Sequence, residues 1–193
     1  NDFLVGISID GPEEYHDTYR VNRAGHPTQK MVLKGWEQLQ NYGVKCNILC
    51  TIHHANQDHG QEVYQYFRDY LGADFIQFIP IVERVHDEDL AQAEAGWRSR
   101  KDNNLPNEKV GLLYRQRGQA VTSRSVGPEK YGVFLLEVFN EWIRHDVGKV
   151  FVQDFDAALA AMFGQISNCV HAPICGNNFA LEFNADVYAC DHW

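Results

Sequence analysis

Three cysteines near the C-terminal end of the sequence have a spacing that could hold a metal centre. Cys169, Cys175 and Cys190 form the pattern C-x5-C-x14-C. Two alternating runs, FALEF and VYACD, flank the turn-forming residues 184–186, and this arrangement predicts a β-hairpin that returns Cys190 to the Cys175 end. Three converging thiolates favour a metal site over buried free thiols, and such a site needs a fourth ligand or an open position.

The spacing leaves both zinc and an iron–sulfur cluster open, because His171 and His192 are ligands that zinc accepts. Cys46 and Cys50 have an even spacing that places both on one face of a strand, so we interpret them as core thiols. Five unevenly placed cysteines do not suit a disulfide-stapled secreted domain. They suit reduced thiols or metal ligands, and we expect a cytoplasmic location.

Asp191 follows Cys190 directly. A carboxylate beside a reactive metal centre could act as a general base. The simpler interpretation is a surface carboxylate at the end of a strand.

Ser8 and Arg20 lie in SIDGPEEYHDTYR, after the first apolar run. An arginine can bind a carboxylate through two parallel hydrogen bonds, and a serine can donate to the same ligand. The alternative is a surface arginine paired with Asp17. Three histidines farther on are predicted to be solvated loop residues without a metal: His53, His54 and His59.

The first eighty residues predict alternating strands and helices. Apolar runs predict strands at residues 3–9, 44–52 and 74–81, and helices at 28–41 and 61–71. Thr28 is predicted to cap the first helix, and Gly43 to end it. Such strands imply a parallel sheet covered on both faces. No G-x-G-x-x-G follows a strand, which favours part of a barrel, with functional residues at the carboxyl ends of the strands.

The remaining segments differ in character. Residues 83–126 are polar with little periodicity, which indicates an insertion or a mobile lid. Residues 129–144 predict an amphipathic helix, KVFVQ a short strand, and residues 154–163 another helix. The predicted core side of the amphipathic helix is Phe134, Leu135, Val138, Phe139 and Trp142.

Composition bounds the function further. The 193 residues are 45% hydrophobic and 12% aromatic, which is enough for a packed core. A net charge of −9 argues against a nucleic-acid partner, and no apolar run approaches the roughly 20 residues that cross a bilayer. The chain opens directly into a predicted strand, so we expect an internal fragment of a longer protein.

Four segments together resemble the anaerobic sulfatase-maturating enzymes, which are radical S-adenosylmethionine proteins with a C-terminal SPASM domain. The segments are SIDGPEEYHDTYR, GWEQLQNYGVKCNILCTIHHAN, FIQFIPIVER and CGNNFALEFNADVYACDHW. The resemblance covers nearly the whole chain except about residues 85–126. C-x5-C-x14-C-D is its specific motif, whereas S-x-D-G is more widespread.

The resemblance implies an α/β fold in which residues 1–148 are the C-terminal half of a partial (β/α)6 barrel. Residues 149–193 would be the start of the cysteine-rich SPASM extension, including the β-hairpin. The radical S-adenosylmethionine signature C-x3-C-x2-C is absent from the chain, and the resemblance places it upstream of residue 1. Ala185 stands where the family usually has glycine.

The resemblance also implies cofactors and residue roles. Ser8 and Arg20 would contact S-adenosylmethionine, and the backbone near Ile81 would line the same pocket. Asp191 would be the base that deprotonates the substrate side chain. An auxiliary [4Fe–4S] cluster would be ligated by Cys169, Cys175 and Cys190.

The implied reaction oxidises a cysteine or serine of a sulfatase polypeptide to Cα-formylglycine. A 5′-deoxyadenosyl radical takes a β-hydrogen, Asp191 accepts the proton, and an auxiliary cluster could accept the remaining electron. The implied partners are the sulfatase and an electron donor such as flavodoxin or ferredoxin, and the fragment alone is expected to be inactive. Two alternatives are another SPASM-type peptide-modifying radical enzyme and a non-catalytic zinc module ligated by Cys169, Cys175, Cys190 and His192.

Overall fold

The computed structural model of the chain describes residues 4–95, 117–166, 172–174, 179–181 and 185–188. These residues fall into two compact units, Asn1–Val152 and Gln153–Trp193. Each unit is described by itself.

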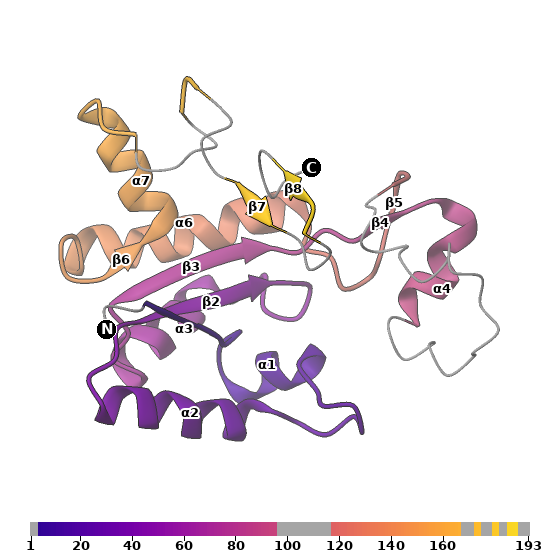
Figure 1. Cartoon of the computed structure of the whole chain (residues 1–193), viewed down its shortest axis with the longest axis horizontal. Helices are drawn as coiled ribbons and strands as arrows, with labels where there is room; N and C mark the ends of the chain where they lie inside the picture. Colours follow the sequence, from indigo (N-terminus) through magenta and orange to yellow (C-terminus); the bar gives the residue numbers. More distant parts are fainter. Residues whose placement is uncertain (1–3, 96–116, 167–171, 175–178, 182–184, 189–193) are drawn as a thin grey trace. The chain divides into compact units, whose positions relative to one another are not determined.

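A parallel sheet forms the centre of the first unit (Figure 1). Its strands are β1 (Val5–Ser8), β2 (Cys46–Ile52), β3 (Phe75–Pro80) and β6 (Phe151–Val152), in the order β1-β2-β3-β6. Every neighbouring pair is parallel. The predicted α/β fold with a parallel sheet is therefore confirmed, and the three long strands lie within their predicted ranges.

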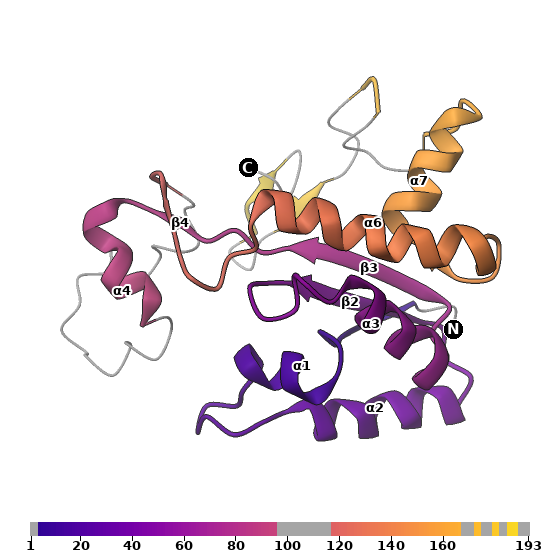
Figure 2. The ribbon, with the colours of Figure 1, turned by 180° about the vertical axis from the view of Figure 1, so that it is seen from behind.

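Helices α3 (Gly60–Gln65) and α6 (Pro128–His145) cover one face of this sheet. They lie behind the strands in Figure 1 and in front of them in Figure 2. A π-helical turn, Tyr66–Tyr70, continues α3. Three of the five predicted core residues of α6 are buried, Leu135 is half-buried and Phe139 is 37% exposed.

The side of the sheet that faces these helices carries the core. Phe78 on β3 packs edge-to-face on Phe134 of α6, with ring centroids 5.3 Å apart. Cys50 is the register partner of Phe78, and Cys46 lies on the same face of β2. Both cysteines are buried and free, as predicted, and burial raises the pKa of both thiols.

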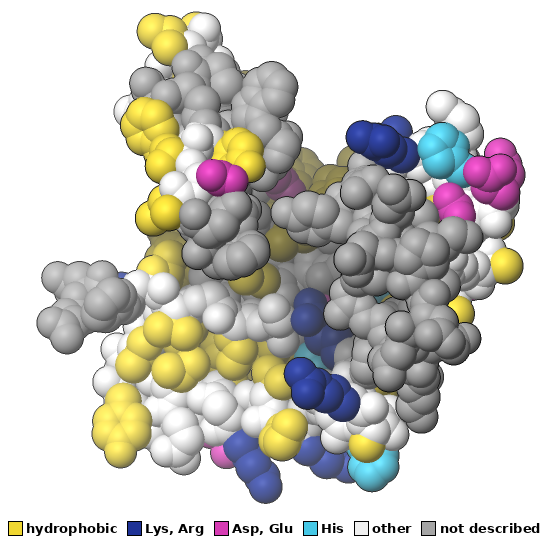
Figure 3. All heavy atoms as spheres, turned by 45° about the vertical axis from the view of Figure 1, so that its right-hand side comes forward, with side chains coloured by type: hydrophobic (Ala, Val, Ile, Leu, Met, Phe, Trp, Pro, Cys, Tyr) yellow, Lys and Arg dark blue, Asp and Glu magenta, His cyan; other side chains and the backbone are white. Residues whose placement is uncertain are grey.

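The opposite face of the sheet is more open. The register places Ser8, Leu49 and Gln77 in one row across β1, β2 and β3. At the other end of the strands Phe75 stacks on Phe151 at 5.0 Å, yet both rings are partly exposed. Figure 3 looks at the molecule partly from this side and shows hydrophobic side chains on its surface.

Two short stretches after β1 differ from the sequence predictions. Helix α1 (Glu13–Tyr19) was not predicted, although Pro12 before it and acidic residues in its first turn are start signals. The Thr28 side chain does not cap α2 (Gln29–Asn41) and instead donates to the Arg20 carbonyl. The Asp17 carboxylate caps α2, since it accepts the N–H groups of Thr28 and Gln29. Gly43 ends the helix with a φ of 64°, as predicted.

The polar segment after β3 contains regular structure that its sequence did not predict. Strand β4 (Arg84–Val85) pairs antiparallel with β5 (Ala120–Val121), and α4 (Leu90–Glu94) lies between them in the chain. Residues 96–116 are outside the described residues. Strands of two residues and a helix of five are too short to leave a readable periodicity.

Gly60 allows α3 and α6 to approach closely. A Cβ at this position would lie 2.5 Å from the Phe134 carbonyl oxygen, and the Gly60 N–H donates to the Glu137 carboxylate at 2.9 Å. We expect Gly60→Ala to lower the free energy of unfolding by about 2 kcal/mol, because the backbone of α6 has to move. Denaturant unfolding, followed by fluorescence of the buried Trp36 and Trp142, measures this change.

Gly35 provides the matched control, because a Cβ there meets nothing within 4 Å on helix α2. Gly35→Ala should stabilise the protein by about 0.5–1 kcal/mol through helix propensity. Equal effects of the two substitutions would contradict the close approach at Gly60.

The second unit contains helix α7 (Gln153–Met162) and the strands β7 (Ala180–Leu181) and β8 (Val187–Tyr188). The strands pair antiparallel, as the predicted hairpin requires. Ala185 has a φ of 69°, the left-handed conformation that favours glycine. In neither unit do the described residues include a helix long and apolar enough to cross a membrane.

Candidate functional site

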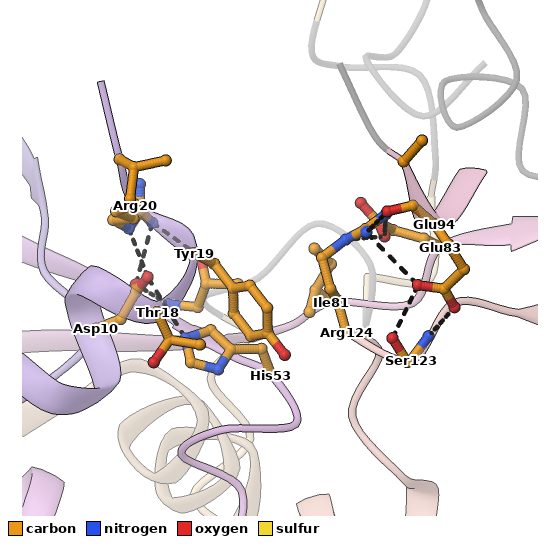
Figure 4. A pocket seen from close by; sticks show the side chains of 13 residues that line it. Asp10, Thr18, Tyr19, Arg20, His53, Ile81, Glu83, Glu94, Ser123 and Arg124 are labelled. Atoms are coloured by element: carbon orange, nitrogen blue, oxygen red, sulfur yellow. Dashed lines mark hydrogen bonds and ion pairs between the residues drawn. The ribbon is translucent and has the colours of Figure 1, made fainter. Parts of the chain in front are cut away.

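A pocket of about 770 Å³ lies at the carboxyl ends of β1, β2 and β3. Figure 4 shows two polar groups facing each other across it, with Ile81 between them. The first group is Asp10, Arg20 and His53, and the second is Glu83, Glu94 and Arg124. This is the edge at which parallel α/β sheets bind their ligands.

The first polar group forms one wall of the pocket and is built on an ion pair between Arg20 and Asp10. The Arg20 Nε donates to Asp10 Oδ2 at 2.5 Å, and Nη2 donates to Oδ1 at 3.0 Å. The same Nη2 donates to the Thr51 hydroxyl at 3.0 Å, and the Thr51 N–H donates to Asp10 Oδ1 at 2.8 Å. The sequence alternatives for Arg20 were a ligand carboxylate or Asp17. The structure gives Asp10 as its partner, because Asp17 is used to cap α2.

His53 lies behind this ion pair and is only 2% exposed, so its prediction as a solvated loop histidine is wrong. The residue directly follows β2, and the Tyr19 ring packs edge-on against its ring with centroids 4.8 Å apart. Its Nδ1 accepts the Ala55 N–H, which places the proton of the neutral ring on Nε2. Nε2 lies 3.7 Å from Asp10 Oδ2, beyond hydrogen-bonding distance, and has no hydrogen-bond partner among the described residues.

The backbone of Asp10 is fixed as firmly as its side chain. Its N–H donates to Nδ1 of the buried His16, and its carbonyl accepts from Asn56 Nδ2. His16 Nε2 in turn contacts the Thr28 hydroxyl at 3.3 Å. Burial lowers the pKa of His16, which favours the neutral ring that these contacts need.

Asp10 is 1% exposed, and its surroundings favour the ionised form. Burial alone would raise the pKa of Asp10. His53, Arg20 and the Thr51 N–H outweigh burial and hold that pKa below its ordinary value. The first wall is thus a buried carboxylate whose charge is balanced mainly by a partly exposed arginine.

The second wall is built around Arg124. Its Nε and Nη2 approach Glu83 Oε2 at 2.9 and 2.7 Å, and the Thr122 hydroxyl donates to the same oxygen at 2.6 Å. Arg124 Nη1 and Nη2 also donate to the carbonyls of Glu94 and Ala93. A cation on the last carbonyls of a helix is favourable, so Arg124 fastens the end of α4 to the end of β3.

Backbone hydrogen bonds join this wall to the sheet. The Ile81 N–H donates to the Ile52 carbonyl, and the Ile81 carbonyl accepts from the Val126 N–H. The His54 N–H donates to the Arg124 carbonyl. The ends of the polar segment are therefore held at the carboxyl edges of β2 and β3.

The structure brings Arg20 and Ile81 to the same pocket. Ser8 lines a neighbouring depression beside β1, which shares Tyr19, Arg20 and Val21 with the main pocket. The other predicted site residues lie outside the described residues: Cys169, Cys175, Cys190 and Asp191.

Sequence reasoning gave no role to several of the pocket residues. Asp10 follows the first predicted strand and His53 the second, so the rule that functional residues lie at the carboxyl ends of strands was a usable signal for both. Glu83, Glu94 and Arg124 carry no local motif, and their contacts join residues about 30 to 41 positions apart.

The residues present fit S-adenosylmethionine in size and in chemistry. A pocket of this volume suits a ligand of that size. Arg20 offers a cation for a carboxylate, Glu83 offers a carboxylate for hydroxyl or ammonium groups, and Ile81 and Tyr19 offer apolar contact. The two described cysteines do not suit a cluster, because both are buried core thiols whose pKa is raised.

Fold and site together define an α/β protein with a ligand pocket at the carboxyl edge of a parallel sheet. No family model matches the chain. Over 194 residues, and 100% of its length, the chain is 37% identical to the serine-type anaerobic sulfatase-maturating enzyme of Bacteroides thetaiotaomicron. It is 28% identical over 196 residues to the cysteine-type enzyme of Clostridium perfringens, again over 100% of the chain.

Solved structures agree with these relatives. The chain resembles native anSMEcpe with bound AdoMet with a TM-score of 0.75 and 27% identity, covering 100% of the chain and 45% of that structure. A structure of anSMEcpe with AdoMet and the Cp18Cys peptide gives the same values. The chain spans 43% and 45% of the length of the two curated relatives. The resemblance to the anaerobic sulfatase-maturating enzymes is therefore confirmed over the full chain, which matches less than half the length of these relatives.

Proposed function

We propose that the chain is part of a radical S-adenosylmethionine enzyme that oxidises a cysteine or serine of a sulfatase to Cα-formylglycine. The observation that carries this proposal is similarity over the full chain to enzymes of both the serine and the cysteine type. The pocket at the carboxyl edge of the sheet supports it, because a structure of similar fold is described with AdoMet bound.

The proposal includes the finer architecture. Residues 1–148 would form the C-terminal half of a partial (β/α)6 barrel, and residues 149–193 the start of a SPASM domain. The row of Ser8, Leu49 and Gln77 opposite the helices supports the barrel, since layers of side chains fill the interior of closed barrels. The β7–β8 hairpin supports the extension, because it lies between two of the three cysteines of the pattern.

The proposed cofactor site uses Ser8, Arg20 and Ile81. S-adenosylmethionine would supply the radical chemistry, while the protein binds and orients it. Arg20 would bind the carboxylate of the cofactor, Ser8 would donate to the same end, and Ile81 would contact the ligand between the two polar walls. The auxiliary [4Fe–4S] cluster would be held by Cys169, Cys175 and Cys190, with Asp191 as the base for the substrate proton.

The proposed partners are a sulfatase polypeptide and a reducing protein such as flavodoxin or ferredoxin. Peptides are described in two of the similar structures, which supports the first of these. A cytoplasmic location is also part of the proposal, on the grounds of the cysteine usage described above.

Metal content and product identity test the proposal. The complete protein, purified without oxygen, should contain several [4Fe–4S] clusters and convert a sulfatase-derived peptide to its formylglycine form, detected by mass spectrometry. Stoichiometric zinc without iron would favour a structural zinc module. Iron with cleavage of S-adenosylmethionine, but modification of a different peptide only, would favour another SPASM-type enzyme.

A further inference from the structure

The guanidinium of Arg20 is only partly used by its contacts within the chain. Nε and both N–H groups of Nη2 are directed to Asp10 and Thr51, at the ends of β1 and β2. Nη1 makes no hydrogen bond or ion pair with any residue that the structure describes. Because the bonded edge of the guanidinium is held against the strand ends, its remaining N–H groups are left for a ligand.

Asp10 is suited to hold this orientation because it cannot easily turn. Its side chain accepts from Thr51 and Arg20, its carbonyl accepts from Asn56, and its N–H donates to His16. The carboxylate is almost fully buried, whereas the Arg20 side chain is 32% exposed at the pocket. A fixed buried anion therefore holds a cation that is open on one side.

We propose that Asp10 is a positioning residue for S-adenosylmethionine, acting through Arg20 so that Nη1 meets the carboxylate of the cofactor. This inference rests on the proposed function and assigns Asp10 a role that it would exert through Arg20. A free arginine side chain would have to give up many rotamers on binding. Asp10 and Thr51 fix those rotamers in advance, so binding costs less conformational entropy.

The test compares two ligands of the complete protein, purified without oxygen and with its clusters intact. S-adenosylmethionine carries the carboxylate, whereas 5′-methylthioadenosine lacks the whole amino-acid portion. Asp10→Asn keeps the size of the side chain and removes its charge. We expect this variant to bind S-adenosylmethionine about 10- to 100-fold more weakly, with less than about a twofold change for 5′-methylthioadenosine.

Two further variants refine the test. Thr51→Val removes the hydroxyl partner of Arg20 and should weaken the binding of S-adenosylmethionine by about two- to tenfold. Adding Asp10→Asn to Arg20→Ala should cause little further loss of affinity for S-adenosylmethionine, because the two residues act as one unit. Asp58→Asn is the matched control, since Asp58 pairs with Lys130 on the surface, away from the pocket. It should leave both affinities unchanged.

The outcomes separate this inference from the proposed function. If Asp10→Asn weakened the binding of both ligands equally, Asp10 would be a structural residue and the inference would be overturned. Unchanged affinity for S-adenosylmethionine would overturn it as well. If Arg20→Ala bound the cofactor normally and the protein still made formylglycine, the inference would fail while the function stood. If the unaltered protein neither bound S-adenosylmethionine nor modified the peptide, the proposed function itself would be wrong.

Discussion

Replacement of Asp191 by alanine in the complete protein is expected, under the proposed function, to lower formylglycine formation by about 10²- to 10⁴-fold, the usual contribution of a general base. Cleavage of S-adenosylmethionine should continue, because that step does not need the substrate proton to leave. The measurement follows 5′-deoxyadenosine by chromatography and the modified peptide by mass spectrometry in the same reaction. The expected signature is therefore cofactor turnover without product.

Asp191→Asn sharpens this experiment, since it keeps the shape of the side chain and removes its basicity. It should be as inactive as the alanine variant. Asp186→Ala, directly before β8, is the control for disturbance of the fold. Normal product yield from Asp191→Asn would remove Asp191 from the mechanism, and loss of cofactor cleavage would point to a damaged site instead.

Arg20→Ala is expected to have two large effects. Removing the guanidinium leaves the Asp10 carboxylate, 1% exposed, without its cationic partner. Leaving a buried charge unpaired lowers the free energy of unfolding by about 3–5 kcal/mol. We expect a loss of about 2–3 kcal/mol here, because the Arg20 side chain is 32% exposed and water can enter the space that it leaves. Affinity for S-adenosylmethionine should fall by more than about 100-fold. Denaturant unfolding and equilibrium binding measure the two effects separately.

Arg68→Ala distinguishes a general loss of stability from a loss of the site. Arg68 pairs with Asp69 and Asp146, and it is not part of the pocket lining. This variant should unfold more easily while its folded form binds S-adenosylmethionine as before. Arg20→Lys should fall between wild type and Arg20→Ala, because an ammonium keeps the charge but cannot reproduce the planar contacts. Unaltered cofactor affinity in Arg20→Ala would contradict its assignment.

The sheet could be predicted from the sequence because its strands are continuous apolar runs. Residues such as Ile48, Cys50 and Phe78 are buried against helices. Burial requires apolar residue types, and these can be recognised in the local sequence. Short elements carry no such signal. Helix α1 has start signals in Pro12 and its acidic first turn, but like the β4–β5 pair it is too short to show a readable periodicity.

The site was predictable only in outline. The rule that ligands bind at the carboxyl ends of strands indicated where the pocket lies, and the family resemblance predicted that Arg20 and Ile81 line it. The partner of Arg20 was missed, because Asp10 and Asp17 are both close in sequence and only the cap of α2 shows which is engaged. Burial of His53 was likewise invisible, since the residues that cover it come from separate segments of the chain.

Cys50 has a consequence for chemical labelling of the protein. Thiol reagents attack the thiolate, and Cys50 is fully buried in β2, a strand paired on both sides, with its pKa raised well above normal by burial. Alkylation of this residue therefore has to wait until the helices that cover its face of the sheet move away. The rate of that reaction reports how often this opening occurs, on a timescale that equilibrium unfolding does not reveal.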